Sequence, residues 1–436
     1  MHENTNKNRT NLTISSEISL LQTRNQRSLT LKKPIIAFIL AALILASSLY
    51  GVYSLIYMAS PSTSSLPPSN STPTPTQTLP TTAPTQSATS NPAAAPTTPP
   101  TKTPESTTSS RSTSSFYPIE TIITEQSPSY VIIKDVYGND VNVTLPVNRV
   151  VSITSGVTEI MYAIGAGDKV VGRDSYSVFP DAALQVPIVA QSSASPNTEL
   201  IVDLKPDLII ADTMLSNSTK ASLQAYLGVP VLIQSATQSD LVVPLVKALG
   251  AVMQKEQNAQ ELVNFMNGVT NLVADRLKNL SENQKPLVYY EWNKAWYSTS
   301  SLGLPHQMIV DAGGINLAAN GTVAYPTLSP EYVYERNPDK IIRILSDKAH
   351  NITDFQVLRQ EVMTRTGLVG TKAVQNQEVY ILSSALRTGI RNPIGLLTMA
   401  KWLHPTLFAD VDPVALHSEM IQKFFKESLT GTYSYP

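Results

Sequence analysis

The sequence ELIVDLKPDLII (residues 199–210) recurs in a related form as EYVYERNPDKII (residues 331–342). In both copies a glutamate comes first, an acidic residue follows four positions later, and Pro-Asp precedes a pair of isoleucines. Asn197 and Ser329, which suit the N-cap of a helix, stand just before the two glutamates. Each copy therefore predicts a short helix, a turn and a buried strand. The repeat predicts two α/β lobes of similar construction.

The composition excludes several classes of protein. The 436 residues suffice for two or more domains, and a formal net charge of −1 gives no basic surface for nucleic acid. Because there is no cysteine, disulfides, thiolate metal sites, cysteine nucleophiles and a bacterial lipid anchor are excluded. The five histidines are scattered, so no site for bare zinc or manganese is expected. We expect His306 and His404 to be capping or core residues.

Residues 34–59 are predicted to form a transmembrane anchor. No charged residue occurs between Pro34 and Met58, and the stretch exceeds the roughly 20 apolar residues that span a bilayer. The alternative is a cleaved signal peptide, which is disfavoured by the length of the apolar run and by the long segment before it. Basic residues concentrate before the span. We therefore expect a single-pass membrane protein with residues 1–33 in the cytoplasm and the binding domain outside.

Residues 60–115 consist almost entirely of Ser, Thr, Pro, Ala, Gln and Asn, and predict a disordered linker. An uncleaved anchor, such a stalk and the lack of a lipid-bearing cysteine together suggest an archaeal cell surface. Sequons make the chain a candidate glycoprotein. On the predicted outer side they occur at Asn70, Asn142, Asn217, Asn279, Asn320 and Asn351.

The folded part is predicted to begin near Phe116, with an N-terminal lobe at residues 116–250, an interlobe helix at 251–284 and a C-terminal lobe at 285–436. Residues 131–145 predict a β-hairpin around Gly138 and Asn139. Apolar strands are expected at 150–154, 170–172, 208–211, 231–233, 287–291 and 379–382, and helices at 157–164, 306–312, 394–403 and 414–425. This alternation predicts mostly parallel sheets.

A long amphipathic helix is predicted between the lobes. From residue 253 to residue 283, apolar side chains recur at steps of three and four positions, interrupted only at Gly268. A helix of about 28 residues would be about 42 Å long. It divides the folded region near its centre, as a rigid connection between two lobes would.

In the order and spacing of these segments the chain resembles the extracytoplasmic substrate-binding proteins of ABC importers. The resemblance is to the long-helix class, which serves ferric siderophores, haem and vitamin B12. It rests on RVVSITSGVTEIMYAIGAGDKVVGRD (149–174), NTELIVDLKPDLII (197–210), LPHQMIVDAGGIN (304–316), SPEYVYERNPDKII (329–342) and the strand QEVYIL, and it covers roughly residues 131–425. It implies two lobes with mostly parallel central sheets, joined by one rigid helix, with the ligand held between them.

The resemblance also implies that one glutamate in each lobe docks on arginines of the membrane permease. By position these are Glu199 and Glu331. Two equivalent acidic anchors would match a two-fold permease dimer, which works with ATPase subunits. The alternative is that both glutamates only stabilise helix N-termini. That alternative explains one glutamate better than two at equivalent positions.

The cleft of such a fold is lined by loops at the C-terminal ends of strands. The expected ligand-binding residues are Thr154, Ser155, Gly156, Tyr176, Trp292, Trp296, Tyr325, Arg387 and Arg391. The aromatic rings could stack on a flat chelate, and the two arginines suit an anionic ligand. The alternatives are core packing for the rings, and a salt bridge or a solvated loop for the arginines. Tyr290 is expected in the core, and Glu159 is expected to be a helix capping or dipole residue.

The expected function is therefore that of a membrane-tethered receptor. It would deliver a ferric siderophore, corrinoid or haem to an ABC permease, with no catalytic residue, no cofactor and no metal ligand of its own. One alternative is a receptor for an oxyanion such as molybdate or tungstate, which the arginines and nearby hydroxyls would suit. Another is a surface sensor without transport. An enzyme is disfavoured because there is no nucleophile elbow, Ser/His/Asp set, P-loop or HExxH motif.

Overall fold

The computed structural model describes residues 121–346 and 351–436, which belong to one compact unit. The predicted cytoplasmic segment (1–33), transmembrane anchor (34–59) and linker (60–115) lie outside the described residues, as do residues 116–120 and the sequon at Asn70. Within the described ranges, no helix combines the length and the apolar character that a membrane crossing requires.

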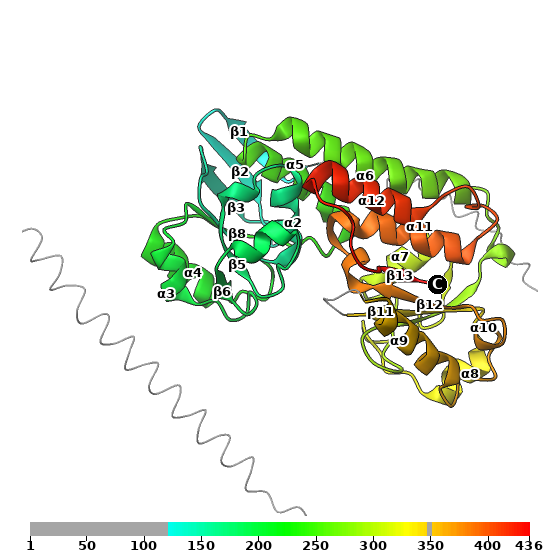
Figure 1. Cartoon of the computed structure of the whole chain (residues 1–436). Helices are drawn as coiled ribbons and strands as arrows, with labels where there is room; N and C mark the ends of the chain where they lie inside the picture. Colours follow the sequence, from blue (N-terminus) through cyan, green and yellow to red (C-terminus); the bar gives the residue numbers. More distant parts are fainter. Residues whose placement is uncertain (1–120, 347–350) are drawn as a thin grey trace, which may run out of the picture. The chain divides into compact units, whose positions relative to one another are not determined.

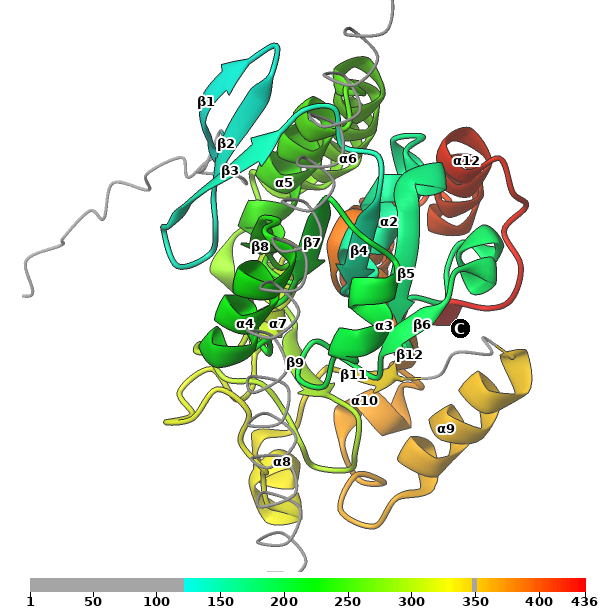
Figure 2. The same cartoon turned by 90° about the vertical axis from the view of Figure 1, so that its left-hand side faces the viewer.

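The N-terminal lobe is built on a parallel five-stranded sheet with the order β6-β5-β4-β7-β8 (Figures 1 and 2). The strands are β4 (Val150–Ile153), β5 (Val170–Asp174), β6 (Ile188–Ala190), β7 (Leu208–Ala211) and β8 (Val231–Ile233); the helices are α2 (Ser155–Ala163), α3 (Thr198–Asp203), α4 (Asn217–Leu227) and α5 (Ser239–Val252). Strands β4 and β7 are buried along their whole length. This burial on both faces explains why they read as continuous apolar runs.

A separate antiparallel sheet precedes this lobe and contains β1 (Ile123–Ser127), β2 (Tyr130–Lys134) and β3 (Asp140–Thr144). The predicted hairpin is confirmed, because β2 and β3 pair across Gly138. Every second residue enters the core, namely Val131 and Ile133 of β2 and Val141 and Val143 of β3, and the residues between them are half-buried or exposed. Strand β1 was not predicted, because its sequence ITEQS is polar and largely exposed and so carries no apolar alternation.

The interlobe helix α6 (Glu256–Leu277) has 22 residues and is shorter than the predicted helix of about 28 residues. The prediction was wrong at its start because α5 ends at Val252 and Gln254 takes a φ of 54°, which breaks the helical path. Gly268 does not interrupt α6. At 1.5 Å per residue the helix is about 33 Å long. Figure 1 shows it running past both lobes.

The C-terminal lobe has a five-stranded sheet with the order β10-β9-β11-β12-β13, parallel except for β13. The strands are β9 (Leu287–Glu291), β10 (Ile315–Asn316), β11 (Lys340–Leu345), β12 (Val379–Ser383) and β13 (Ser434–Tyr435). The helices are α7 (Pro305–Asp311), α8 (Pro330–Arg336), α9 (Ile352–Thr364), α10 (Lys372–Gln375), α11 (Asn392–Leu403) and α12 (Pro413–Phe425). Both copies of the repeat are confirmed as helix, turn and strand, in α3–β7 and α8–β11.

One hydrophobic core runs through both lobes. It joins side chains of β4 and α2 in the first lobe to those of β9 and α11 in the second, and α5 and α6 lie between them. Two smaller clusters cover the other face of each sheet. The lobes are therefore held at a fixed interface by apolar packing.

Candidate ligand-binding site

The two repeated glutamates occupy matching places. Glu199 and Glu331 lie in the first turns of α3 and α8, and both are exposed. Asn197 and Ser329 cap these helices, since each side-chain oxygen accepts a hydrogen bond of 3.1 Å from the backbone amide three residues further on. Neither glutamate forms an ion pair with any residue in the described part of the chain. The caps are thus complete without the glutamates, which present two free carboxylates to solvent.

The lobes contact each other through polar groups near the start of α2. Arg391 donates to both carboxylate oxygens of Glu159, with Nε to Oε2 at 3.0 Å and Nη2 to Oε1 at 2.5 Å. The amide of Gly389 donates to the carbonyl of Ala236 at 2.8 Å. The interpretation of Glu159 as a capping or dipole residue was wrong, because its carboxylate reaches across the interface instead. The Arg391 guanidinium is buried and committed to this contact, which favours the salt-bridge alternative for that residue.

Three of the predicted site residues come together at the second lobe. Trp292 follows β9, and its ring meets the ring of Tyr325 edge to face at 5.4 Å. The Arg387 guanidinium lies 3.7 Å from the centre of the Trp292 ring. We call Trp292, Tyr325 and Arg387 the ligand shelf.

Arg387 is the cation of the ligand shelf and lacks a protein counter-ion. Burial lowers the pKa of Arg387 from its ordinary value, and its Nε has no hydrogen-bond partner. No carboxylate among residues 121–346 and 351–436 forms an ion pair with it. A partly buried cation without a counter-ion is an unfavourable arrangement that an anionic ligand would relieve.

A groove of about 970 Å³ lies between the lobes and includes Arg387 in its wall. The first lobe contributes residues 237–240, and the second contributes α7 with the loop before it, Thr388 and Asn392; the C-terminal half of α6 completes the wall. Its volume is within the range of pockets that hold organic ligands.

Asp311 of α7 accepts a hydrogen bond from Gln307 at 2.7 Å, and burial raises the pKa of Asp311 to about 6.

The predicted residues of the first lobe lie at strand ends. Thr154 is the N-cap residue of α2, although its side chain makes no capping bond, and Ser155 and Gly156 begin that helix. A Cβ on Gly156 would lie 2.5 Å from Ala236 Cβ, so glycine is needed there for close approach. Tyr176 follows β5 and is exposed. Gly156 thus lies beside Ala236, which precedes the groove-lining segment; Thr154, Ser155, Gly156 and Tyr176 are not themselves among the groove-lining residues.

Trp296 lies on the opposite side of β9 from the ligand shelf. Its ring stacks on Tyr289 at 6.3 Å, whereas Tyr290 contacts Trp292 at 6.5 Å and is fully buried, as predicted. Successive side chains of a strand point to opposite faces of the sheet. The two tryptophans therefore lie in different surroundings, and Trp296 packs against the core of the second lobe.

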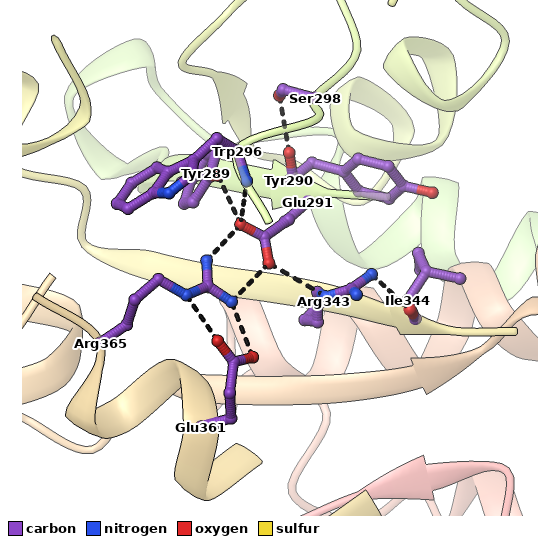
Figure 3. Close-up of polar contacts among 9 residues, drawn as sticks. All are labelled: Tyr289, Tyr290, Glu291, Trp296, Ser298, Arg343, Ile344, Glu361 and Arg365. Carbon is purple, nitrogen blue, oxygen red and sulfur yellow. Dashed lines mark hydrogen bonds and ion pairs between the residues drawn. The ribbon is translucent and has the colours of Figure 1, made fainter. Parts of the chain in front are cut away.

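Sequence reasoning missed a buried ionic network around Glu291 (Figure 3). The Glu291 carboxylate is fully buried and pairs with Arg343 at 3.0 Å and Arg365 at 2.5 Å. Arg365 also pairs with Glu361 at 2.8 Å. The available signals were a glutamate that ends the apolar strand LVYYE and an arginine inside KIIRIL.

His306 and His404 each lie within hydrogen-bond distance of another group of the protein. His306 Nδ1 lies 3.1 Å from Asn316 Nδ2, and the buried His404 Nε2 lies 3.1 Å from the carbonyl of Gly313. His404 ends α11, which agrees with a capping or core role. In the part of the chain that the structure describes, no three His, Cys, Asp or Glu side chains gather as a metal site.

Two α/β lobes, a helix that packs on both and a groove at their interface define a bilobed solute receptor. The family model of periplasmic binding proteins matches residues 150–386, more than half of the chain, and the chain belongs to this family. This is a family of binding proteins, and the expectation that the chain is not an enzyme is confirmed.

Curated relatives share this character. The chain is 28% identical over 287 residues to an uncharacterized ABC transporter substrate-binding lipoprotein, YvrC of Bacillus subtilis, covering 64% of this chain and 87% of the relative. It is 27% identical over 240 residues to the vitamin B12-binding protein of Vibrio cholerae, covering 55% of this chain and 82% of the relative.

Solved structures show the same fold. The TroA-like periplasmic binding protein FepB from Veillonella parvula matches with a TM-score of 0.61 and 24% identity, over 70% of this chain and 99% of that chain. Molybdate-bound MolA from Haemophilus influenzae matches with a TM-score of 0.58 and 20% identity, over 69% of this chain and 99% of that chain. The predicted two-lobed α/β fold with parallel sheets is therefore confirmed.

Proposed function

We propose that this protein is the substrate-binding receptor of an ABC importer and that it carries a metal chelate, namely a ferric siderophore, a corrinoid or haem. The observation that carries the proposal is the groove of about 970 Å³ whose wall includes Arg387 of the ligand shelf. An organic chelate needs a pocket of that size, whereas a tetrahedral oxyanion fills a small part of it. The name of the Vibrio cholerae relative, a vitamin B12-binding protein, supports this class of ligand.

The ligand shelf supplies two kinds of interaction to such a chelate. Trp292 and Tyr325 are not among the groove-lining residues, and Arg387 covers one face of the Trp292 ring, so these rings would stack on or edge against a flat ring system where it extends beyond the groove. The guanidinium of Arg387 can pair with a carboxylate, catecholate or phosphate group in a two-point contact. The metal then stays coordinated by its organic ligand, so the protein needs no metal ligands.

Cargo delivery would proceed with little rearrangement of the lobes. The Glu159–Arg391 pair, the hydrogen bond from Gly389 to Ala236 and the packing of α6 on both lobes all oppose hinge motion. We expect only slight closure on binding. Small-angle scattering would contradict this expectation if ligand produced a large compaction.

Docking on the permease would use Glu199 and Glu331. Both are exposed first-turn glutamates whose helices have other caps, so their carboxylates are free to pair with arginines on a two-fold permease dimer. The ATPase subunits of the importer would then couple cargo release to hydrolysis.

The same proposal includes tethering at the cell surface. Residues 34–59 would anchor the chain, with its N-terminus cytoplasmic, and residues 60–115 would hold the receptor on the outer side, at an archaeal cell surface. N-glycans would attach at exposed sequons. The described sequons, Asn142, Asn217, Asn279, Asn320 and Asn351, are all exposed.

The decisive test is a titration of tryptophan fluorescence with cobalamin, ferric enterobactin, haemin and molybdate. The full-length chain is compared with Arg387→Met and with the matched control Arg336→Met, an exposed arginine 5.0 Å from the Tyr332 ring. Binding of one chelate, weakened in Arg387→Met when the chelate is anionic and unchanged in the control, supports the proposal. Silence across the probes overturns it and favours a sensor without transport.

A molybdate or tungstate receptor is the second candidate, because Arg387 is a cation without a protein counter-ion. Binding of molybdate alone, lost in Arg387→Met, would assign the protein to that class. Arg391 is not among the groove-lining residues and holds Glu159 through Nε and Nη2. The oxyanion would therefore rest on Arg387 with neighbouring hydroxyls.

A further inference from the structure

The turn that carries Trp292 is built on an unusual backbone. Trp292 donates its amide to the carbonyl of Tyr297 at 2.7 Å, which closes residues 292–297 into a compact turn. Within it the backbone of Trp296 has a φ of 65°, a conformation that residues other than glycine rarely adopt. Such a backbone persists only where its surroundings fix it.

Glu291 makes the contact that holds the turn (Figure 3). Its Oε2 accepts the amide of Trp296 at 2.8 Å and the hydroxyl of Tyr289 at 2.7 Å. Arg365 donates to both carboxylate oxygens, at 2.5 and 2.9 Å, and its guanidinium lies 5.3 Å from the Trp296 ring. One carboxylate thus joins the backbone of the turn to α9 and, through Arg343, to β11.

Backbone hydrogen bonds connect the turn to the segment that contains Tyr325. Residues 296–300 and 324–328 form an antiparallel ribbon, in which Leu328 donates to the Trp296 carbonyl at 2.8 Å and Ser298 donates to the Pro326 carbonyl at 2.9 Å. Tyr325 lies in the second half of this ribbon. The residue after Leu328 is the N-cap of α8, the helix that carries Glu331.

Gly367 closes the same cluster from the other side. It has a φ of 92°, and a Cβ there would lie 2.9 Å from Pro330 Cβ and 3.3 Å from the Trp296 ring. Gly367, in the loop after α9, therefore lies close to both the Trp296 ring and Pro330, the first residue of α8. The loop thus packs between the turn and the start of the helix that carries Glu331.

Stability alone does not account for this carboxylate. A buried ion pair is often no more stabilising than apolar residues of the same volume, because desolvation offsets the attraction. A carboxylate does provide directed acceptors for one amide, one hydroxyl and the Arg365 guanidinium at once, in addition to its ion pair with Arg343. Its specific contribution is geometric, since it determines where the turn lies.

We propose that Glu291 is the positioning residue of the ligand shelf: by fixing the Trp292–Tyr297 turn it orders Trp292 and Tyr325 before ligand arrives. This inference rests on the proposed function for its ligand-binding consequence. Without Glu291, both aromatic side chains would have to be ordered during binding. Ordering two side chains weakens binding by roughly tenfold to a hundredfold.

The test compares the full-length chain with Glu291→Met/Arg343→Met, which removes one charge of each sign and leaves Arg365 paired with Glu361. Glu361→Gln is the matched control, because Glu361 binds the same arginine but does not touch the turn. Affinity is measured for whichever of cobalamin, ferric enterobactin, haemin or molybdate the wild type binds. Hydrogen exchange is followed at the amides of Trp296, Ser298 and Leu328.

The double variant is expected to bind the probe roughly tenfold to a hundredfold more weakly, and the control within about twofold. The three amides are expected to lose protection in the double variant while β9 and β11 keep theirs. Wild-type affinity in a folded double variant, or loss of protection spread evenly over β9, β11 and α9, overturns the proposal. If the double variant does not fold, Arg365→Lys, which keeps the charge, is expected to show the same local exchange.

If the wild type binds none of the probes, the proposed function fails separately. The exchange pattern then still decides whether Glu291 fixes the turn: local loss of protection supports the positioning role, and unchanged protection refutes it.

Discussion

Replacing Arg391 by methionine leaves the Glu159 carboxylate at the lobe interface without a partner. The two side chains are 4% and 14% exposed and share two hydrogen bonds, at 3.0 and 2.5 Å. Removing one member of such a buried pair costs about 3–5 kcal/mol, because the other charge remains desolvated. We expect Arg391→Met and Glu159→Met each to lower the free energy of unfolding by about that amount. The double replacement is expected within about 1 kcal/mol of the wild type.

The assay is urea denaturation of the wild type, the two single variants and the double variant at pH 7. The four free energies give a coupling energy, which the values above place at about 5 kcal/mol or more. The more exposed pair of Arg276 and Asp410 is the control, with side chains 25% and 72% exposed, and its coupling is expected to be much smaller because solvent screens it. Single effects at the interface that add to within about 0.5 kcal/mol would refute the reasoning.

Burial raises the pKa of Asp311 from 3.8 to about 6, so the folded state binds this proton more tightly than the unfolded state. Stability should therefore fall as pH rises from about 4 to about 6, and thermal melts of Asp311→Asn should lack that part of the fall. Gly367→Ala should lower the free energy of unfolding by about 1–3 kcal/mol, because the residue has positive φ and no room for a Cβ; an unchanged denaturation midpoint would contradict this. Glu199→Gln and Glu331→Gln should each change stability by less than about 0.5 kcal/mol, yet reduce ATPase stimulation in the reconstituted importer. Full stimulation by the double variant would exclude the docking role.

Most of the fold could be predicted from the sequence, because the patterns that define strands and helices are local. The strand at residues 287–291 was predicted with the bounds that the structure has, since Pro286 precedes the apolar run and Glu291 ends it. The interlobe helix was overestimated because apolar periodicity continues past Gln254, whose positive φ leaves no trace in the pattern. The polar strand β1 was missed because pairing, not burial, makes it a strand.

The site was less predictable because its contacts are distant in sequence. The rule that ligands bind at strand ends correctly brought Trp292 and Arg387 to one region. Arg391 finds its partner 232 residues earlier, so no local pattern could separate an ion pair from a ligand group. Trp296 is four residues from Trp292, but the turn between them sends its ring to the other face of β9. Glu291 could be recognised only once β11 and α9 were placed beside it.

The continuous core that the lobes share would also determine how the receptor is degraded. Because α5, α6 and α11 contribute side chains to one core that both lobes share, neither lobe has a boundary at which it can open alone, and we expect one cooperative melting step. Ligand bound at the interface then stabilises the whole described region by mass action. A receptor without cargo would be degraded throughout at one rate, and cargo would slow proteolysis at sites far from the groove as much as near it. Protein turnover would thus report on nutrient supply, with no dedicated sensor.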